Sequence, residues 1–413
     1  MSGLSIYFIA FYFPPVDRGS GVFRIICNAR EFVRIGWQVS VLTVREAALP
    51  DWRKDYYSAI PAGVEVQRAF GFDARRHLSI AGRYPDILAT PDRWATWIPF
   101  AIPRAIWHVW RHQPSFVVTT SPIASAHVIG AFVSKVTKAR WVAELRDPLL
   151  LESHPSEPLA RRVVKWLEGV VVRRAEQLIF TTDDTLLDYE QRYGAVIRAK
   201  SVVIENGYDE QTFSQAERRG QAISKSQRFT FLHSGVLYPD GRDAAPLLEA
   251  VARLKSEGLF TRDKALLKLR ASGTEAHYAA IVAKLGVEDV VEISPGVGLL
   301  EALSEMLSAD ALVLIQGSRF NRQVPAKLYD YARAGRPLLC LVDSQGATAK
   351  ALGKLGLKDM MSPDDVGGIR DRLEMMIKDG NTRQRLTVAP SLVAAHSREA
   401  RARRFAELLA AKS

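Results

Sequence analysis

The chain has 413 residues, 47% of them hydrophobic, and a formal net charge of +11. This length suffices for two domains of ordinary size, each with its own core. No apolar run reaches the length of a transmembrane helix, and the basic excess favours an anionic partner, such as a nucleotide, an acidic membrane surface or nucleic acid. Cys27 and Cys340 lie in apolar runs, which favours buried free thiols in a reducing cytoplasm over a catalytic thiol. The apolar run 6–13 lacks the basic flank and cleavage site of a signal peptide, so we expect a buried strand there.

The first part of the chain alternates between strand and helix patterns. The predicted segments are a strand at 4–13, a helix at 22–36, a strand at 37–44 and a strand at 63–69. In the first turn, Gly19 and Gly21 flank Ser20 and would let backbone N–H groups approach a ligand closely. The pattern is not G-x-G-x-x-G, so it supports a dinucleotide site only weakly, and a simple tight turn is the alternative.

A predicted helix ending near residue 112 combines aromatic and basic side chains. The residues are Trp94, Trp97, Phe100, Ile102, Trp107 and Trp110, interleaved with Arg93, Arg104 and Arg111. This composition suits a membrane interface. The alternative is that half of these aromatic residues belong to the hydrophobic core, and we favour this interpretation for the later tryptophans, Trp107 and Trp110. His108 and His112 are four residues apart and could form a metal pair, but no third ligand is near, so we expect exposed helix surface.

The next segments predict two parallel strands whose carboxyl ends face one crevice. The strands are 116–120 and 141–144, with a helix at 125–137 between them. Parallel strands place their carboxyl ends at the same edge of a sheet. The second strand runs into a loop that contains Arg146 and Asp147. One interpretation of these two residues is an ion pair that fixes the loop.

The remainder of the first half is basic and then polar. Residues 158–174 predict a basic amphipathic helix, for which a solvated surface and contact with anionic lipid are the two interpretations. Short strands are expected at 177–181 and 202–204. The polar run 214–228 predicts an interdomain linker.

The second half repeats the alternation and therefore predicts a second parallel sheet. The expected strands are 229–233, 265–271, 290–293, 311–315 and 338–342, with helices near 244–254, 275–285, 299–307, 347–355, 364–378 and 397–411.

Residues 323–342 contain the strongest site pattern in the sequence. Pro325 suits the first turn of a helix and Gly335 its carboxyl cap, so this helix begins after the carboxyl end of a strand. Helix N-termini at that edge of a sheet favour phosphate. Lys327 could neutralise a phosphate while Asp330, on the same face, binds a ribose diol; a Lys327–Asp330 surface ion pair explains the spacing equally well.

At this point the sequence resembles a known family. The matching segments are PAKLYDYARAGRP at 325–337, SPIASAH at 121–127, WVAELRDP at 141–148, ENGYD at 205–209, the YFPP…G-S-G opening and the stretch around HSGVLYPDGRD. They are similar to motifs of family-four glycosyltransferases, which are retaining, metal-independent enzymes of the GT-B fold. Asp330 stands where the family usually has the second Glu of its E-x7-E motif. The first Glu would fall at Arg322 and is absent.

The resemblance implies an α/β fold of the GT-B type, with two doubly wound Rossmann-like domains facing across a cleft. The expected domains are 1–213 for the acceptor, a linker at 214–228, 229–395 for the nucleotide sugar, and a helix at 396–413 that returns to the first domain.

The resemblance also implies roles for single residues. Gly19, Ser20 and Gly21 would bind substrate, and Arg146 and Asp147 would lie at the cleft, where Asp147 orients the acceptor hydroxyl or accepts its proton. Gly235 would lie against the donor diphosphate. The family often has a basic residue after this glycine; here it is Val236, so Arg242 and Lys327 would share the neutralisation of the leaving group. Gly296 lies in the loop expected to meet the nucleotide base.

The function implied is transfer of a sugar from a nucleotide-diphosphate sugar to an acceptor hydroxyl with retention, in polysaccharide or glycolipid assembly. The expected partners are that donor, a saccharide or lipid-linked saccharide acceptor and an anionic membrane surface, without nucleic acid, cofactor or metal. The expected location is cytoplasmic and peripheral on the inner face of the plasma membrane. The alternatives are a GT-B nucleotide-sugar 2-epimerase, for which Asp147 is the available acid/base group, and a non-enzymatic basic protein that binds membranes or nucleic acid.

Overall fold

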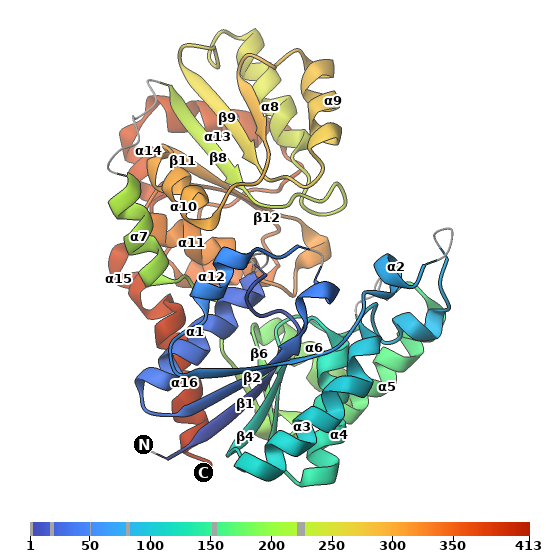
Figure 1. Ribbon diagram of the computed structural model, residues 1–413. Helices are drawn as coiled ribbons and strands as arrows, with labels where there is room; N and C mark the ends of the chain where they lie inside the picture. The colour runs from blue at the N-terminus through green and yellow to red at the C-terminus, as the bar shows by residue number, and fades with distance from the viewer. Residues whose placement is uncertain (1–2, 17–19, 50, 80–82, 151–154, 221–227) are drawn as a thin grey trace. The chain divides into compact units, whose positions relative to one another are not determined.

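The computed structural model describes residues 3–16, 20–49, 51–79, 83–150, 155–220 and 228–413 (Figure 1). The chain divides into two compact units. Unit 1 comprises Met1–Glu205 and Arg398–Ser413, and unit 2 comprises Asn206–Ser397. Each unit is an α/β structure built on one parallel sheet, as the alternating pattern predicts.

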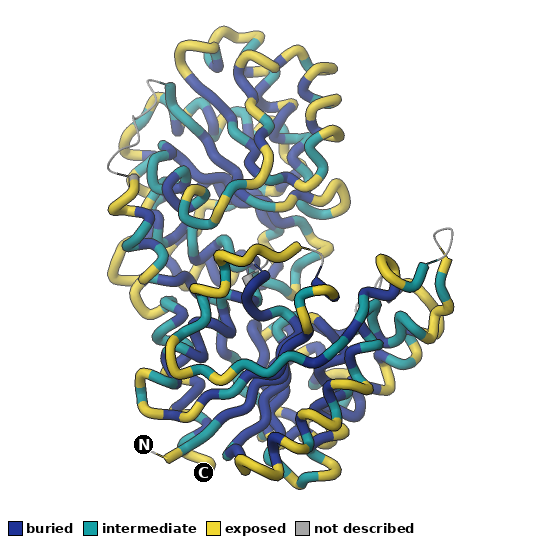
Figure 2. The backbone as a smooth tube through the Cα atoms, in the orientation of Figure 1, coloured by how far each residue is buried: buried dark blue, intermediate teal, exposed yellow. Residues whose placement is uncertain are grey.

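Unit 1 contains a seven-stranded parallel sheet with the order β3-β2-β1-β4-β5-β6-β7. Its strands are β1 Ser5–Ile9, β2 Gln38–Val44, β3 Val64–Ala69, β4 Phe116–Thr120, β5 Trp141–Leu145, β6 Gln177–Phe180 and β7 Ser201–Val203. The order reverses between β1 and β4, which makes the carboxyl ends of these two strands a switch point where such sheets bind ligands. Every residue of β4, β5 and β6 is buried, because helices cover both faces of a parallel sheet (Figure 2).

The helices of unit 1 include the last helix of the chain. They are α1 Ser20–Arg34, α2 Ala74–His77, α3 Ile98–His112, α4 Ala124–Thr137, α5 Pro158–Arg174, α6 Asp183–Tyr193 and α16 Arg398–Ala410. Helix α16 packs on α1, where the rings of Phe405 and Phe32 meet edge-on at 5.5 Å. An ion pair between Arg403 and Glu31 lies beside this contact. Both termini lie in this unit (Figure 1).

The tryptophans near α3 divide between core and surface in the opposite way to the prediction. The earlier tryptophans are core, since Trp94 is 8% and Trp97 0% exposed and both pack against Phe11. The later ones are surface residues, since Trp107 is 59% and Trp110 62% exposed. The expectation that the later tryptophans are core was therefore wrong, because the contacts with the core at Phe11 are made by the residues that precede α3.

The histidine pair of α3 also differs from its prediction. His108 is buried rather than exposed. A third potential ligand is present, because Glu65 on β3 lies beside His108 and His112. The expectation that no third ligand is near was wrong, because that ligand comes from another strand and is distant in sequence.

Unit 2 contains a five-stranded parallel sheet with the order β10-β9-β8-β11-β12. Its strands are β8 Phe229–Ser234, β9 Ala265–Arg270, β10 Val291–Ser294, β11 Ala311–Gln316 and β12 Leu338–Val342. Its helices are α7 Glu210–Gly220, α8 Ala245–Ser256, α9 Glu275–Leu285, α10 Leu299–Ser308, α11 Lys327–Ala334, α12 Ala347–Lys354, α13 Val366–Lys378, α14 Gly380–Arg385 and α15 Pro390–Val393. The strand order reverses between β8 and β11.

The segment expected to be a linker is partly helical. Residues 214–220 belong to α7, which packs on α10 with Phe213 and Ala216 buried in the core of unit 2. Helix α7 has few apolar residues, and most of its other side chains are charged or polar, so its composition resembles that of a linker. The few apolar residues nevertheless lie on one face of the helix, and that face is buried. The rest of the expected linker, apart from Arg228, lies outside the described residues.

In the part of the chain that the structure describes, no helix is long and apolar enough to span a bilayer. Cys27 and Cys340 are both buried and unpaired with each other, as expected. Burial raises the pKa of the Cys340 thiol to about 12, which keeps it protonated and unreactive.

Candidate functional site

The candidate site of unit 2 lies where the strand order reverses. Strand β8 ends at Ser234 and is followed by Gly235, and the neighbouring β11 ends at Gln316. Helix α11 begins at Lys327, after the chain has returned from β11. Its hydrogen bonding starts within the preceding turn, where Leu328 donates to the Pro325 carbonyl. The arrangement places a lysine, a glycine and a helix N-terminus at the switch point.

Lys327 and Gly235 are in close contact. Gly235 has a φ of +122°, and a Cβ added to it would lie 3.0 Å from Nζ of Lys327. A larger residue would therefore be strained in its backbone and would displace the ammonium group. This glycine leaves room beside Lys327 at the carboxyl end of β8.

His233 positions Lys327 from the interior. Nδ1 of His233 lies 2.9 Å from the Val313 carbonyl oxygen, and Nε2 lies 3.1 Å from Nζ of Lys327. Nε2 also lies 3.1 Å from the Gly235 carbonyl oxygen. With the proton on Nδ1, the ring donates to the Val313 carbonyl and Nε2 accepts from Lys327, and the Gly235 carbonyl then receives no hydrogen bond from the ring. Burial, together with the charge of Lys327, holds the pKa of His233 well below its ordinary value, so the ring is neutral.

Lys327 has an unusually low affinity for its proton. Burial lowers its pKa to about 7, and the nearby charge of Arg242 contributes. An anion bound beside the ammonium group would reverse this effect and restore the full charge. Lys327 is thus a partly desolvated cation whose hydrogen bond goes to His233 rather than to Asp330. The surface ion pair of Lys327 with Asp330 is not formed.

Arg242 supplies a second cation at this edge. Its Nε donates to Oε1 of Gln316 at 2.8 Å, and its guanidinium group lies 4.5 Å from the centre of the Phe320 ring. Gln316 is buried and also donates to the carbonyl of Gln323 at 2.9 Å. A buried amide therefore fixes both the arginine and the loop that precedes α11. The contacts with Gln316 and Phe320 fix the Arg242 side chain, whereas a solvated surface arginine would be free to move.

The other predicted residues of unit 2 lie on neighbouring loops and helices. Asp330 is half-buried on α11, and its charge contributes to raising the pKa of Tyr331, an effect that is mainly due to burial. The Tyr331 hydroxyl accepts a hydrogen bond from the Ser234 amide at 2.8 Å and thereby ties α11 to the end of β8. Gly296 is exposed in the loop after β10, where a Cβ would lie 3.6 Å from that of Ala271. Arg322 is exposed.

In unit 1, Gly21 and Arg146 lie against each other. A Cβ on Gly21, in the first turn of α1, would overlap the Arg146 guanidinium group. Arg146 donates from Nε to the Ser121 carbonyl at 2.8 Å, while the Ser121 hydroxyl accepts from the Arg146 amide at 2.8 Å. The carboxyl ends of β4 and β5 are thus joined, as the parallel arrangement predicts. Burial lowers the pKa of Arg146, and the charges of Glu144 and Asp147 oppose this change.

Asp147 follows Arg146 but does not pair with it. Among the described residues, Asp147 has an amide hydrogen bond to the Ser121 hydroxyl at 3.3 Å, and its carboxylate has no hydrogen bond or ion pair. The interpretation of an Arg146–Asp147 ion pair is therefore wrong. Gly19 lies outside the described residues, and Ser20 begins α1 without a described side chain.

A buried ion pair supports the site of unit 1. Glu144 accepts from Nε of Arg24 at 2.7 Å and from the Thr120 hydroxyl at 2.7 Å. Burial would raise the pKa of Glu144, but the guanidinium groups of Arg24 and Arg146 hold it below its ordinary value. Arg24 also donates to the carbonyls of Ile204 and Glu205. The pair connects α1, β5 and the end of β7.

Asp92 occupies the N-terminus of α4. Its carboxylate accepts from the Ser125 amide at 2.7 Å and from the Ser125 hydroxyl at 2.9 Å. This helix end is therefore capped by the protein itself and does not offer its N–H groups to a phosphate. Sequence reasoning did not identify Asp92, His233 or Gln316 as site residues, because each acts through a partner that is distant along the chain.

The fold defines the class of protein. A crystal structure of Anabaena HepE in complex with UDP-glucose has a TM-score of 0.69 to this chain at 15% identity, covering 99% of this chain and 100% of that one. Sucrose-phosphate synthase from Thermosynechococcus elongatus has a TM-score of 0.69 at 13% identity, with both chains covered in full. WaaG, a glycosyltransferase involved in lipopolysaccharide biosynthesis, has a TM-score of 0.59 at 16% identity, covering 97% and 95% of the two chains. The fold is that of the GT-B glycosyltransferases.

A family model matches most of the first unit. Residues 28–207 match the family model of the glycosyl transferase 4-like domain. The resemblance to family-four glycosyltransferases is therefore confirmed over these residues. No curated protein matches the sequence.

Proposed function

We propose that the protein transfers a sugar from a nucleotide-diphosphate sugar to an acceptor hydroxyl with retention of configuration, in polysaccharide or glycolipid assembly. The observation that carries this proposal is the position of Lys327 against Gly235, with Arg242 nearby, at the switch point of unit 2. Two cations and a helix N-terminus, with glycine in place of a side chain, form a binding site for a diphosphate.

The charges also suit the chemistry. When the glycosidic bond to the donor breaks, negative charge develops on the leaving diphosphate, and fixed cations stabilise that charge. Lys327, Arg242 and the dipole of α11 supply this stabilisation without a metal ion. Asp330, one turn into α11, is the group proposed to bind the ribose hydroxyls of the donor. Gly296 has no side chain, so the nucleotide base can approach the backbone of the loop after β10. Because HepE was crystallised with UDP-glucose, UDP-sugars are the first donors to test.

Unit 1 supplies the groups proposed for the acceptor. The carboxylate of Asp147 has no hydrogen bond or ion pair among the described residues, so it is available to orient an acceptor hydroxyl or accept its proton. Arg146 lies beside the first turn of α1, and a cation next to a helix N-terminus favours an anionic group. An acceptor that carries a phosphate near its hydroxyl fits these features.

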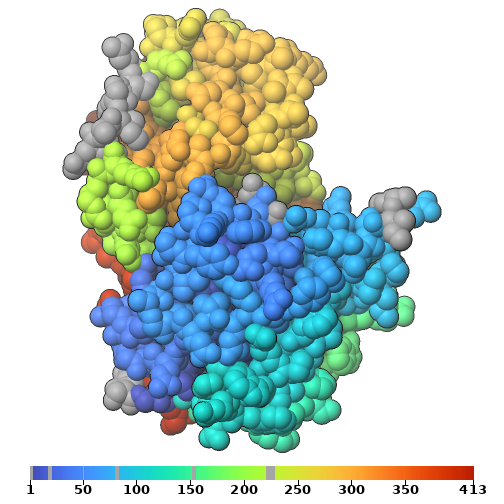
Figure 3. Space-filling view, in the orientation of Figure 1, coloured from blue at the N-terminus to red at the C-terminus, as the bar shows by residue number. Residues whose placement is uncertain are grey.

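A lipid-linked acceptor and a peripheral membrane location form the finer part of the proposal. Helix α3 exposes Trp107 and Trp110, and α5 exposes Trp166 next to Lys165. Helices α3 and α5 both pack on α4, and α3 lies on the outer surface of unit 1 in Figure 3. Exposed tryptophans with basic neighbours suit the headgroup region of an anionic bilayer.

The test is thermal unfolding of the protein in EDTA with UDP-, GDP-, ADP-, CMP- and dTDP-sugars. A ligand at a hundred times its Kd should add about 2.7 kcal/mol of stability. One nucleotide class should raise the unfolding midpoint, and Lys327→Ala and Asp330→Ala should abolish the rise. Lys284→Ala is the matched control, because Lys284 is an exposed lysine in the last turn of α9, at the opposite end of the helix from the strand carboxyl ends.

Two outcomes would overturn the proposal. A protein that shows no shift with any nucleotide sugar, but binds anionic vesicles or nucleic acid, is a binding protein rather than a transferase. A protein that converts a nucleotide sugar to its C2 epimer without an acceptor is an epimerase.

A further inference from the structure

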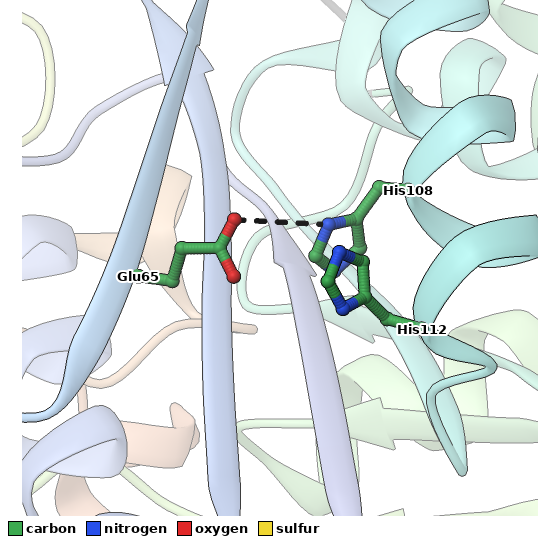
Figure 4. Close-up of side chains that lie close together, drawn as sticks. All are labelled: Glu65, His108 and His112. Carbon is green, nitrogen blue, oxygen red and sulfur yellow. Dashed lines mark ion pairs between the residues drawn. The ribbon is translucent and has the colours of Figure 1, made fainter.

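We propose that Glu65, His108 and His112 form a binding site for a divalent transition-metal cation such as Zn²⁺ in unit 1 (Figure 4). Glu65 lies on β3, the edge strand of the sheet, and the two histidines lie one helical turn apart on α3. One potential ligand atom from each residue lies within 4.8 Å of the other two. Figure 4 shows the Glu65 carboxylate on the strand facing the His108 ring on the helix, with the His112 ring stacked against that of His108.

The separations between the ligand atoms are somewhat longer than those around a bound metal. Zn²⁺ binds imidazole nitrogen and carboxylate oxygen at about 2.0–2.2 Å, so tetrahedral ligands are about 3.4 Å apart. Oε1 of Glu65 lies 4.0 Å from Nδ1 of His108. The rings of His108 and His112 are stacked with their centres 4.5 Å apart. Since Glu65 and His112 are exposed, their side chains can make the small movement that coordination requires.

His108 is already held in a form that binds metal. Its ring is buried and stacks on Tyr7 at a centre distance of 4.1 Å, so its orientation is fixed. In this orientation Nδ1 lies 4.0 Å from Oε1 of Glu65. The carboxylate of Glu65 would offset part of the charge of the cation.

Gln67 marks the centre of the site. Its amide nitrogen lies 2.7 Å from Nδ1 of His108 and 2.8 Å from Oε1 of Glu65, so an N–H donor group stands between the two ligand atoms. The amide oxygen accepts from the Tyr7 hydroxyl at 3.1 Å. If the amide turned over, its oxygen would face the metal as a fourth ligand and its nitrogen would donate to the Tyr7 oxygen.

A hollow adjoins the ligand cluster at Gln67. A cavity of about 450 Å³ is lined by Gln67, Phe100, Pro103, Arg104 and Trp107, so Gln67 belongs to both the cavity and the ligand cluster. A cation could enter from this side. Because its ligands come from β3 and α3, a bound cation would fix the edge strand to the helix and stabilise unit 1.

The experiment is metal titration of the tag-free protein after removal of metal with EDTA. Calorimetry with Zn²⁺ should give one site with a micromolar or lower Kd, and Co²⁺ should give visible absorption bands of a nitrogen- and oxygen-ligated site. Zn²⁺ should also raise the unfolding midpoint. His112→Ala and Glu65→Gln should each weaken binding at least tenfold; both residues are exposed, so these variants should fold.

His277→Ala is the control, because His277 is an exposed histidine on α9 of unit 2. This variant should bind Zn²⁺ as the unchanged protein does. The proposal is overturned if Zn²⁺ does not bind, or if His112→Ala and Glu65→Gln bind it as tightly as the unchanged protein.

Discussion

The ammonium group of Lys327 lies 3.1 Å from Nε2 of His233, a buried and neutral histidine. A neutral imidazole can hold the lysine in place without neutralising it, whereas a carboxylate in the same position would compete with a phosphate. The charge of the lysine therefore remains available to a ligand. Its lowered pKa is the energetic cost of this arrangement in the unliganded protein.

The first prediction concerns pH. Because the pKa of Lys327 is about 7 in the unliganded protein, the group is largely neutral above that pH, and binding of UDP there must take up a proton. The affinity for UDP should therefore fall as pH rises from about 7 to about 9, by at most about tenfold per pH unit. Calorimetry in buffers of different ionisation enthalpy measures both the affinity and the proton uptake.

The same group affects stability with the opposite sign. An unfolded lysine, with a pKa of 10.5, holds its proton more tightly than folded Lys327 does, so the contribution of this group to the free energy of unfolding rises from pH 7 to pH 10.5. Lys327→Met should thus raise the unfolding midpoint near pH 6 by about 2–4 °C while it abolishes UDP binding. Lys327→Arg stays charged and should lose the pH dependence of affinity. A pH dependence that persists in Lys327→Arg would contradict this assignment.

The second prediction separates backbone strain from loss of the site. Gly235→Ala should destabilise the protein by about 1–3 kcal/mol and lower the affinity for UDP at least tenfold, because the new methyl group meets Lys327. Gly286→Ala is the matched control, since Gly286 has a φ of +65° with nothing within 4 Å of its Cβ position. It should lose stability but keep its affinity. Denaturant unfolding and calorimetry measure the two effects, and equal affinities in both variants would disprove the role of Gly235.

The third prediction tests the contact between Gly21 and Arg146. Gly21→Ala should displace the Arg146 guanidinium group and lower kcat at least tenfold, with little change in the affinity for UDP, whose proposed site lies in unit 2. Gly353→Ala, in α12 with open space around its Cβ position, should instead stabilise the protein by about 0.5–1 kcal/mol. Transferase assays with saturating donor report kcat. Unchanged turnover in Gly21→Ala would show that Arg146 has no part in the reaction.

The fourth prediction concerns the aromatic surface of α3. Replacing Trp107 and Trp110 by Ser should reduce binding to vesicles that contain anionic phospholipid, with little effect on stability, because both side chains are exposed. Val196→Ser is the control, since Val196 is also exposed but lies outside α3 and α5. Vesicle flotation measures the bound fraction. Equal binding by the tryptophan variant and the control would remove the membrane part of the proposal.

Much of the fold was predictable because strong periodicity and end signals agree. The helix predicted at 158–174 is α5 with the same bounds, since Pro158 begins it and apolar residues recur along one face. The strands predicted at 116–120 and 338–342 are β4 and β12, because short apolar runs between turns are typical of buried parallel strands. In each case the information is local.

The site was predictable only where a motif lies in one segment. Lys327 and Gly235 were named from their own segments, but their contact joins β8 to α11. Contacts between side chains on separate elements depend on packing, for which the sequence alone has no periodic signal. For the same reason the sequence did not reveal Glu65 as a neighbour of His108, or Gln316 as the partner of Arg242.

The position of α16 has a consequence for how the chain folds on the ribosome. This helix places Phe405 and Leu409 in the core of unit 1, although all of unit 2, residues 206–397, is synthesised before it. At roughly 5–20 residues per second, the nascent first unit waits roughly 10–40 s with part of its apolar surface uncovered. A nonsense mutation that removes residues 398–413 would therefore uncover part of the core of unit 1, although it leaves residues 1–205 in place.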